Sequence, residues 1–167
     1  MPKKQYSLEQ FAYRRQAPMD AIMNTAFNVV LVVASLWGLD SVNVVPPPPR
    51  EGSFSHSLFG TLLPMAIVMT MVITIVGVRV TVKKRIAGDV HPPLEPGVRW
   101  FRHAFTAAIF RAFAAFGLVS MFGLIIHYAW PLATMSVPLA AVVVGVVAAV
   151  LAYVESVGAV LKTRAIG

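Results

Sequence analysis

Cysteine is absent from the 167-residue chain, and charged residues make up only 13% of it. Without cysteine there is no disulfide, no thiolate metal site and no cysteine nucleophile. Soluble domains are typically about 25% charged, whereas this chain is 57% hydrophobic with a mean hydropathy of +0.74. A soluble domain of this length cannot hide so much apolar surface, so the composition favours a lipid bilayer as the environment.

Four apolar stretches are long enough to cross a bilayer, which takes about 20 helical residues. They cover residues 21–45, 58–80, 104–130 and 136–161. Only a helix satisfies its own backbone hydrogen bonds in lipid, and runs such as AAVVVGVVAAV lack the alternation that a β-barrel needs. The sequence therefore predicts an all-α integral membrane bundle of four transmembrane helices, formed by residues 21–161.

Two short tails flank this region, residues 1–20 and 162–167. In the first tail, Ser7 to Gln10 has the spacing of a capping box, and Arg14 and Arg15 follow. A short helix on the inner membrane surface is one prediction for this tail, and a frayed tail is the other. The first apolar stretch is too long for the core of a signal peptide, so we expect it to remain as an anchor.

Lysine and arginine are distributed unevenly along the chain. The N-terminal tail, the second connection and the C-terminal tail together carry twelve, whereas the first connection has only Arg50 and the third has none. The positive-inside rule assigns the twelve to the cytoplasm. Both termini are therefore predicted to be cytoplasmic, in a multi-pass protein of the inner (plasma) membrane. The net charge of +7 is then a topology signal and an attraction to lipid headgroups, so no nucleic-acid partner is expected.

Ionisable side chains inside the apolar stretches are the most informative residues, because a charge in hydrocarbon costs at least about 2.5–3.5 kcal/mol. Arg111 and Glu155 each lie about 10 Å from the cytoplasmic end of their helices. Asn28 and Thr74 fall near the same depth in the first two helices. We predict one polar layer of Asn28, Thr74, Arg111 and Glu155. Its first interpretation is a structural clasp that fixes helix register, and its second is an ion or proton site.

Small residues recur at every fourth position in the last two helices, a spacing that allows helix backbones to approach closely. They are Ala104, Ala108 and Ala112 in one helix, and Ala141, Gly145 and Ala149 in the other. Packing of these two helices on each other is the first interpretation, and a docking face for another protein is the second.

Two metal hypotheses rest on a pair of residues each. His56 and His127 are both near the outer edge, where a haem could be ligated, and Met65 and Met69 have the spacing that trimeric copper transporters use. Interfacial histidine and core methionine are the preferred interpretations, so we expect neither a cofactor nor a metal. The sequence has no phosphate-binding loop, zinc-protease motif or serine nucleophile elbow. We therefore expect a protein that is not an enzyme.

Residues 62–85 read LLPMAIVMTMVITIVGVRVTVKKR, an apolar helix with an early proline and a basic end. This segment resembles small four-helix bacterial inner-membrane proteins of uncharacterised function, and the resemblance implies no site. Our functional hypothesis is an accessory or structural subunit of a larger membrane assembly, with the bilayer and other membrane subunits as partners. A transport complex, with a lipid or other hydrophobic substrate, is preferred because redox ligands are missing. The alternatives are a small autonomous transporter gated by Arg111 and Glu155, and a haem or copper protein.

Overall fold

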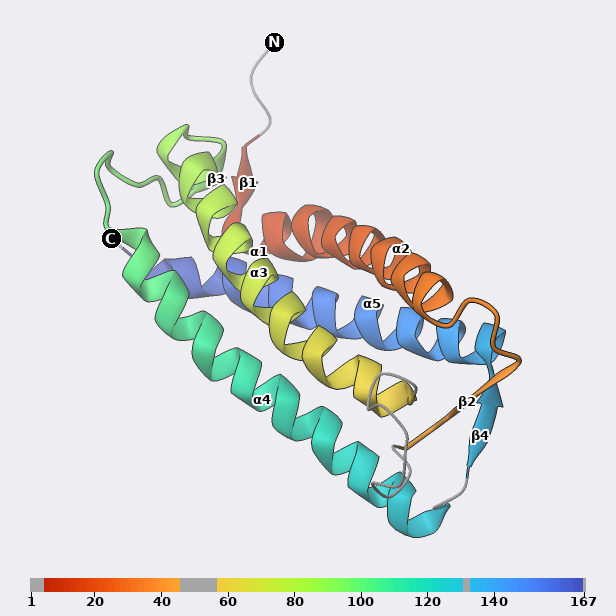
Figure 1. Cartoon of the computed structure of the whole chain (residues 1–167). Coiled ribbons are helices and arrows are strands. Elements are labelled where there is room, and N and C mark those ends of the chain that lie inside the picture. Colours follow the sequence, from red (N-terminus) through yellow and green to blue (C-terminus); the bar gives the residue numbers. More distant parts are fainter. Residues whose placement is uncertain (1–4, 46–56, 131–132, 167) are drawn as a thin grey trace.

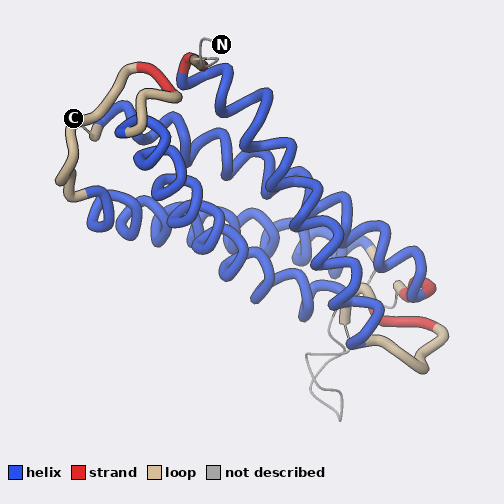
Figure 2. Tube along the Cα trace, turned by 90° about the horizontal axis from the view of Figure 1, so that it is seen from above, coloured by secondary structure: helices blue, strands red, loops and turns tan. Residues whose placement is uncertain are grey.

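A computed structural model of the chain describes residues 5–45, 57–130 and 133–166. Within these residues, four helical segments are long and apolar enough to cross a membrane, and this confirms the four-helix prediction at the level of length and composition. The segments are Leu8–Ser35, Leu58–Ile86, Trp100–Ala129 and Val137–Ala165. They run along the length of one bundle (Figures 1 and 2).

Short strand pairs lie at both ends of the bundle. At one end, β1 (Tyr6–Ser7) pairs in parallel with β3 (Val90–His91), and the end of the last helix lies nearby (Figure 1). We call this the terminal end. At the other end, β2 (Ser41–Asn43) pairs antiparallel with β4 (Thr134–Ser136). We call this the loop end. Each pair joins segments that are far apart in the sequence.

The first helical segment starts earlier than the sequence suggested. It consists of α1 (Leu8–Phe11), a π-helical turn (Ala12–Gln16) and α2 (Ala17–Ser35), which follow one another without a break. The predicted capping box is confirmed: the Gln10 backbone N–H donates to Ser7 Oγ at 3.1 Å, and the Ser7 N–H donates to Gln10 Oε1 at 3.3 Å. The tail is therefore neither a separate helix nor frayed over residues 8–20, because the box starts a helix that continues into α2.

The same segment also ends earlier, at Ser35 rather than at residue 45. A turn follows in which Gly38 has φ +86°, a conformation that favours glycine. Beyond it, Val42 and Val44 are buried in the extended chain that carries β2. These valines extend the apolar stretch in the sequence, but they pack beneath the loop end and not in a helix.

The other three helices are α3 (Leu58–Ile86), α4 (Trp100–Ala129) and α5 (Val137–Lys162), and a short 3₁₀ turn (Thr163–Ala165) follows α5. Helix α3 begins at the predicted residue because Ser57 Oγ accepts from the Gly60 N–H at 3.0 Å. It extends six residues beyond the predicted end. Lys83, Lys84 and Arg85 occupy its last turn, where cations interact favourably with the helix dipole.

The helices pack in the order α2, α5, α3, α4, so α3 lies between α4 and α5, which contact each other little. The prediction that the last two helices pack on each other through their small residues is therefore wrong. Ala104 of α4 packs with Val78 and Val82 of α3. Gly145 of α5 instead meets α2, since a Cβ there would lie 2.9 Å from Val29 Cγ2. The two small-residue stripes serve two different interfaces.

The core has a different character at each end of the bundle. Its largest apolar cluster lies toward the loop end and includes Val32, Leu36, Leu58, Leu62, Ala66, Ala115, Val119, Ala140 and Val144. Toward the terminal end, smaller apolar clusters alternate with buried polar side chains such as Thr81, Arg85 and Ser156. The polar contacts of the helices are therefore concentrated in the terminal half.

Candidate functional site

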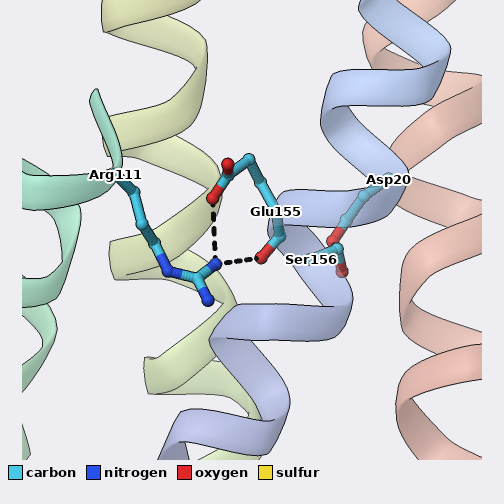
Figure 3. A network of polar contacts seen from close by, with 4 residues as sticks. All are labelled: Asp20, Arg111, Glu155 and Ser156. Atoms are coloured by element: carbon cyan, nitrogen blue, oxygen red, sulfur yellow. Dashed lines mark hydrogen bonds and ion pairs between the residues drawn. The ribbon is translucent and has the colours of Figure 1, made fainter. Parts of the chain in front are cut away.

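Arg111 of α4 and Glu155 of α5 form an ion pair across the gap between their helices (Figure 3). Arg111 Nη1 donates to Glu155 Oε2 at 2.9 Å and to the Glu155 backbone carbonyl, also at 2.9 Å. The side chains are 28% and 13% exposed, so both are mostly enclosed. Because α4 and α5 contact each other little elsewhere, this pair is the main polar link between them among the described residues.

The guanidinium of Arg111 lies directly over the backbone of α5 at Gly158. A Cβ atom at that position would overlap the guanidinium carbon and both of its terminal nitrogens. Glycine therefore leaves the space that Arg111 needs to reach both oxygens of Glu155. Gly158 was not among the residues predicted from the sequence, although it lies three residues after Glu155, the spacing at which helical side chains share a face.

A second polar contact joins the opposite side of α5 to α2. Ser156 Oγ donates to Asp20 Oδ2 at 2.7 Å, and Gln16 Nε2 donates to the two Asp20 carboxylate oxygens at 3.0 and 3.1 Å. In Figure 3 the Glu155 side chain points toward Arg111, whereas Ser156 points toward Asp20. One turn of α5 is thus held to α4 on one side and to α2 on the other. The cluster contains one guanidinium and two carboxylates.

Asp20 and Ser156 were missed because Asp20 was assigned to the tail. A signal for them was present in the sequence: Gln16, Asp20, Asn24 and Asn28 recur at every fourth position, which places four polar side chains on one face of a helix. In the structure this face turns inward, where Asn24 Nδ2 donates to the Asp20 carbonyl at 2.7 Å and Asn28 Nδ2 to the Asn24 carbonyl at 2.8 Å.

The structure does not bring all four residues of the predicted polar layer together. Asn28 lies beside Val29, which meets Gly145, and Gly145 is ten residues from Glu155, or about 15 Å along the helix. The depth of Asn28 was misjudged because the first helix starts at Leu8 and not at residue 21. Asp20 lies at the level of the pair instead.

Thr74 lies at the predicted level. It is one turn from Gly77, which meets Ala159 in the neighbouring turn of α5. It is fully buried, and its hydroxyl has no hydrogen-bond partner among the described residues. Thr74 therefore shares the depth of Arg111 and Glu155 without a direct hydrogen bond to either.

The two metal hypotheses find no complete site within the described residues. His56 lies outside them, and His127 is near the loop end of α4, where its ring contacts Tyr128 edge to face. Met69 Sδ accepts from Asn28 Nδ2 at 3.6 Å, and Met65 belongs to the apolar packing around it. No group of three or more histidine or acidic side chains that could hold a metal occurs in the described part of the chain.

A third polar group stabilises the terminal end. Arg85, only 3% exposed, donates to the Pro92 carbonyl at 2.6 Å and to the carbonyls of Thr163 and Ile166. It thereby donates to backbone carbonyls at the end of the fourth helical segment, where intrahelical donors run out, and the Thr163 carbonyl also accepts from the Ile166 N–H at 3.2 Å. From the sequence, Arg85 was interpreted only as part of a topology signal, but its side chain links α3, the following connection and the C-terminal segment.

The arrangement around Arg111 and Asp20 can clamp three helices in register, and its carboxylates can also exchange protons. Comparisons of the chain with protein families, curated proteins and solved structures gave no match. Function is therefore inferred from the residues and their geometry.

Proposed function

We propose that this chain is a non-catalytic subunit of a larger membrane protein assembly, with four transmembrane helices and both termini in the cytoplasm. The four long apolar helical segments support a multi-pass protein. The orientation rests on the basic residues, because Arg14, Arg15, Lys83, Lys84 and Arg99 all belong to segments that meet at the terminal end. Anionic lipid headgroups of the inner leaflet would face this end.

The observation that carries the proposal is the distribution of polar groups along the bundle. Asp20, Arg111, Glu155 and Ser156 all lie in the terminal half. The core of the loop-end half is mainly a continuous cluster of aliphatic and alanine side chains with Phe59, and Asn28 and Ser57 are buried polar side chains there. A solute pathway needs polar groups or a cavity across the whole membrane. A bundle with this core supports a packing role more readily than transport by the single chain.

Within assemblies, we favour a transport complex over an electron-transfer complex. The chain has no cysteine and four histidines, so it supplies few ligands for redox centres. A lipid or another hydrophobic molecule is the substrate class we propose for such a complex, because large apolar side chains are exposed along all four helical segments. The second candidate is an autonomous transporter gated by Arg111 and Glu155, which is favoured by the enclosed ion pair and by a second carboxylate, Asp20, on the other side of α5.

The test compares the protein purified at native expression level with the protein alone in liposomes. We expect stoichiometric co-purification of membrane subunits in mild detergent, and we expect liposomes containing only this chain to show no more solute or proton flux than empty ones. A matched sample with both Arg111→Leu and Glu155→Leu controls for leaks. Saturable flux that the double variant abolishes would reject the subunit proposal in favour of the autonomous transporter.

A further inference from the structure

Helices α2 and α3 diverge toward the loop end and leave a groove between them on one side of the bundle. The two helices contact each other little, because α5 lies between them. The groove has a volume of about 380 Å³. Its walls include Phe27, Leu31, Val68 and Val72, which are 48–62% exposed, so the groove opens toward the surroundings of the bundle.

Two asparagines and one threonine lie in this mainly apolar groove, and the hydroxyl of the threonine, Thr61, donates to the Ser57 carbonyl at 3.2 Å. Both hydrogen-bond donors of Asn28 are used, since its amide nitrogen donates to the Asn24 carbonyl at 2.8 Å and to Met69 Sδ at 3.6 Å. Its amide oxygen accepts no hydrogen bond from the described residues, and Asn28, although only 4% exposed, lines the groove. The amide oxygen of Asn24 also accepts none there, and its amide nitrogen uses one of two hydrogens, in the bond to the Asp20 carbonyl. The groove thus offers two amide oxygens that lack donors, beside one remaining N–H.

Pro64 of α3 also lines the groove. It lies in the second turn of α3, where its nitrogen has no hydrogen to donate to the carbonyl of Gly60. In hydrocarbon no water replaces that donor, so carbonyls that lose their helical donor in this way are satisfied by neighbouring helices or hydroxyl side chains. On the α3 side, too, the helix is therefore short of a donor.

These acceptors decide between the possible occupants of the groove. A lipid acyl chain has no hydrogen-bond donor and would leave the oxygens unpaired. A second copy of the chain is a poorer match at this depth, because every fully exposed side chain in residues 22–34, 64–76, 110–125 and 139–154 is apolar and its donors there, such as the Ser120 hydroxyl, are only partly exposed. A transmembrane helix of another protein can supply donors, and helix contacts in membranes commonly use serine, threonine and asparagine in this way.

We propose that the groove between α2 and α3 binds an apolar transmembrane helix of a different subunit, which presents a hydroxyl or amide donor to Asn24 and Asn28. This inference rests on the proposed role as a subunit and assigns the surface that makes the contact. The open walls would receive the apolar side chains of the partner helix. The asparagines would fix its depth and rotation.

The first experiment places a photo-crosslinking benzoylphenylalanine at Phe27 in the full chain in native membranes. Phe110 of α4 is the matched control, because it is also phenylalanine, is 72% exposed against 62% for Phe27, and does not line the groove. We expect position 27 to crosslink to one transmembrane segment of another protein, with a donor residue within a turn of the crosslinked site by mass spectrometry. Position 110 should not reach that segment. Crosslinks from position 27 only to lipid, or only to a second copy, would overturn the proposal.

The second experiment fills the groove from its rim with Val68→Trp. The control is Val150→Trp, at a residue of similar exposure on α5 outside the groove. Yield and melting temperature establish that both variants fold. We expect Val68→Trp to abolish both the crosslink from position 27 and the co-purification, and Val150→Trp to preserve both. If the subunits co-purify equally with both variants, the groove proposal fails while the subunit proposal stands. If wild-type protein co-purifies with nothing, the subunit proposal itself fails.

Discussion

Substituting Gly158 with alanine should have opposite effects on stability depending on whether Arg111 is present. In the wild-type chain, the new Cβ would occupy the space of the guanidinium. The guanidinium is the far end of a flexible side chain, so we expect Arg111 to move away while the helices remain in place. Gly158→Ala is therefore a way to break the contact with Glu155 without removing either charge.

The expected size follows from two opposing contributions. Displacing Arg111 costs its two hydrogen bonds to Glu155, and hydrogen bonds of charged groups contribute about 1.5–3 kcal/mol. Replacing glycine by alanine within a helix contributes about 0.5–1 kcal/mol of stability. Because both bonds come from one nitrogen of Arg111, we count them as one charged contact of about 1.5–3 kcal/mol. Subtracting the gain of about 0.5–1 kcal/mol leaves a net loss of about 0.5–2.5 kcal/mol in the wild-type chain. In the Arg111→Leu background, which has no guanidinium, only the gain of about 0.5–1 kcal/mol should remain.

The measurement is the unfolding free energy in mixed micelles titrated with a denaturing detergent, followed by circular dichroism. Gly117→Ala on α4 is the matched control, because a Cβ there has no atom within 4 Å, so it should have the same effect in both backgrounds. A double-mutant cycle then gives the coupling between positions 111 and 158. If Gly158→Ala changes stability equally with and without Arg111, the guanidinium does not occupy this position and the clasp interpretation is wrong.

Two further predictions concern the other side of α5 and the orientation of the chain. Ser156→Ala should lower the unfolding free energy by about 1–2 kcal/mol, because Asp20 loses a charged hydrogen bond; equal stability of the variant and the wild type in the same titration would contradict that role. Reporters fused after Gly167 or within Ala87–Gly97 should behave as cytoplasmic, and one after Glu51 as external. A reporter active only outside the cytoplasm that functions at the C-terminus would refute the proposed topology.

The ion pair of Arg111 and Glu155 could be predicted from the sequence because hydrocarbon does not solvate a charge. Two opposite charges at the same depth in neighbouring apolar stretches are therefore expected to pair. Their depths could be counted from the predicted cytoplasmic ends of two helices whose bounds were within four residues of the structure. Hydropathy is reliable where a helix ends near the end of its apolar stretch. The helix count and the pair both followed from this property.

Hydropathy failed for the first helix because its polar residues are inside the bundle. Gln16 and Asp20 lowered the apparent hydropathy of the segment, and the start of the helix was therefore placed after them. The capping box at Ser7 was recognised, but it was not connected to the apolar helix that follows. Periodicity would have corrected this, since a polar face with a four-residue repeat indicates a continuing helix.

The order of the helices could not be derived from the small-residue stripes, because such a stripe shows that a neighbour is close without identifying it. Helix α5 has close neighbours on two faces: Gly145 meets α2, whereas Ala148 and Ala152 pack against α3.

This central position of α5 has a consequence for function. The polar contacts of Glu155 and Ser156 hold α4 and α2 to α5 in the terminal half, and α2 and α3 are left apart toward the loop end, where the asparagine-lined groove opens. A perturbation of the clasp should therefore change stability first, and a substitution in the groove should change partner binding with little effect on folding.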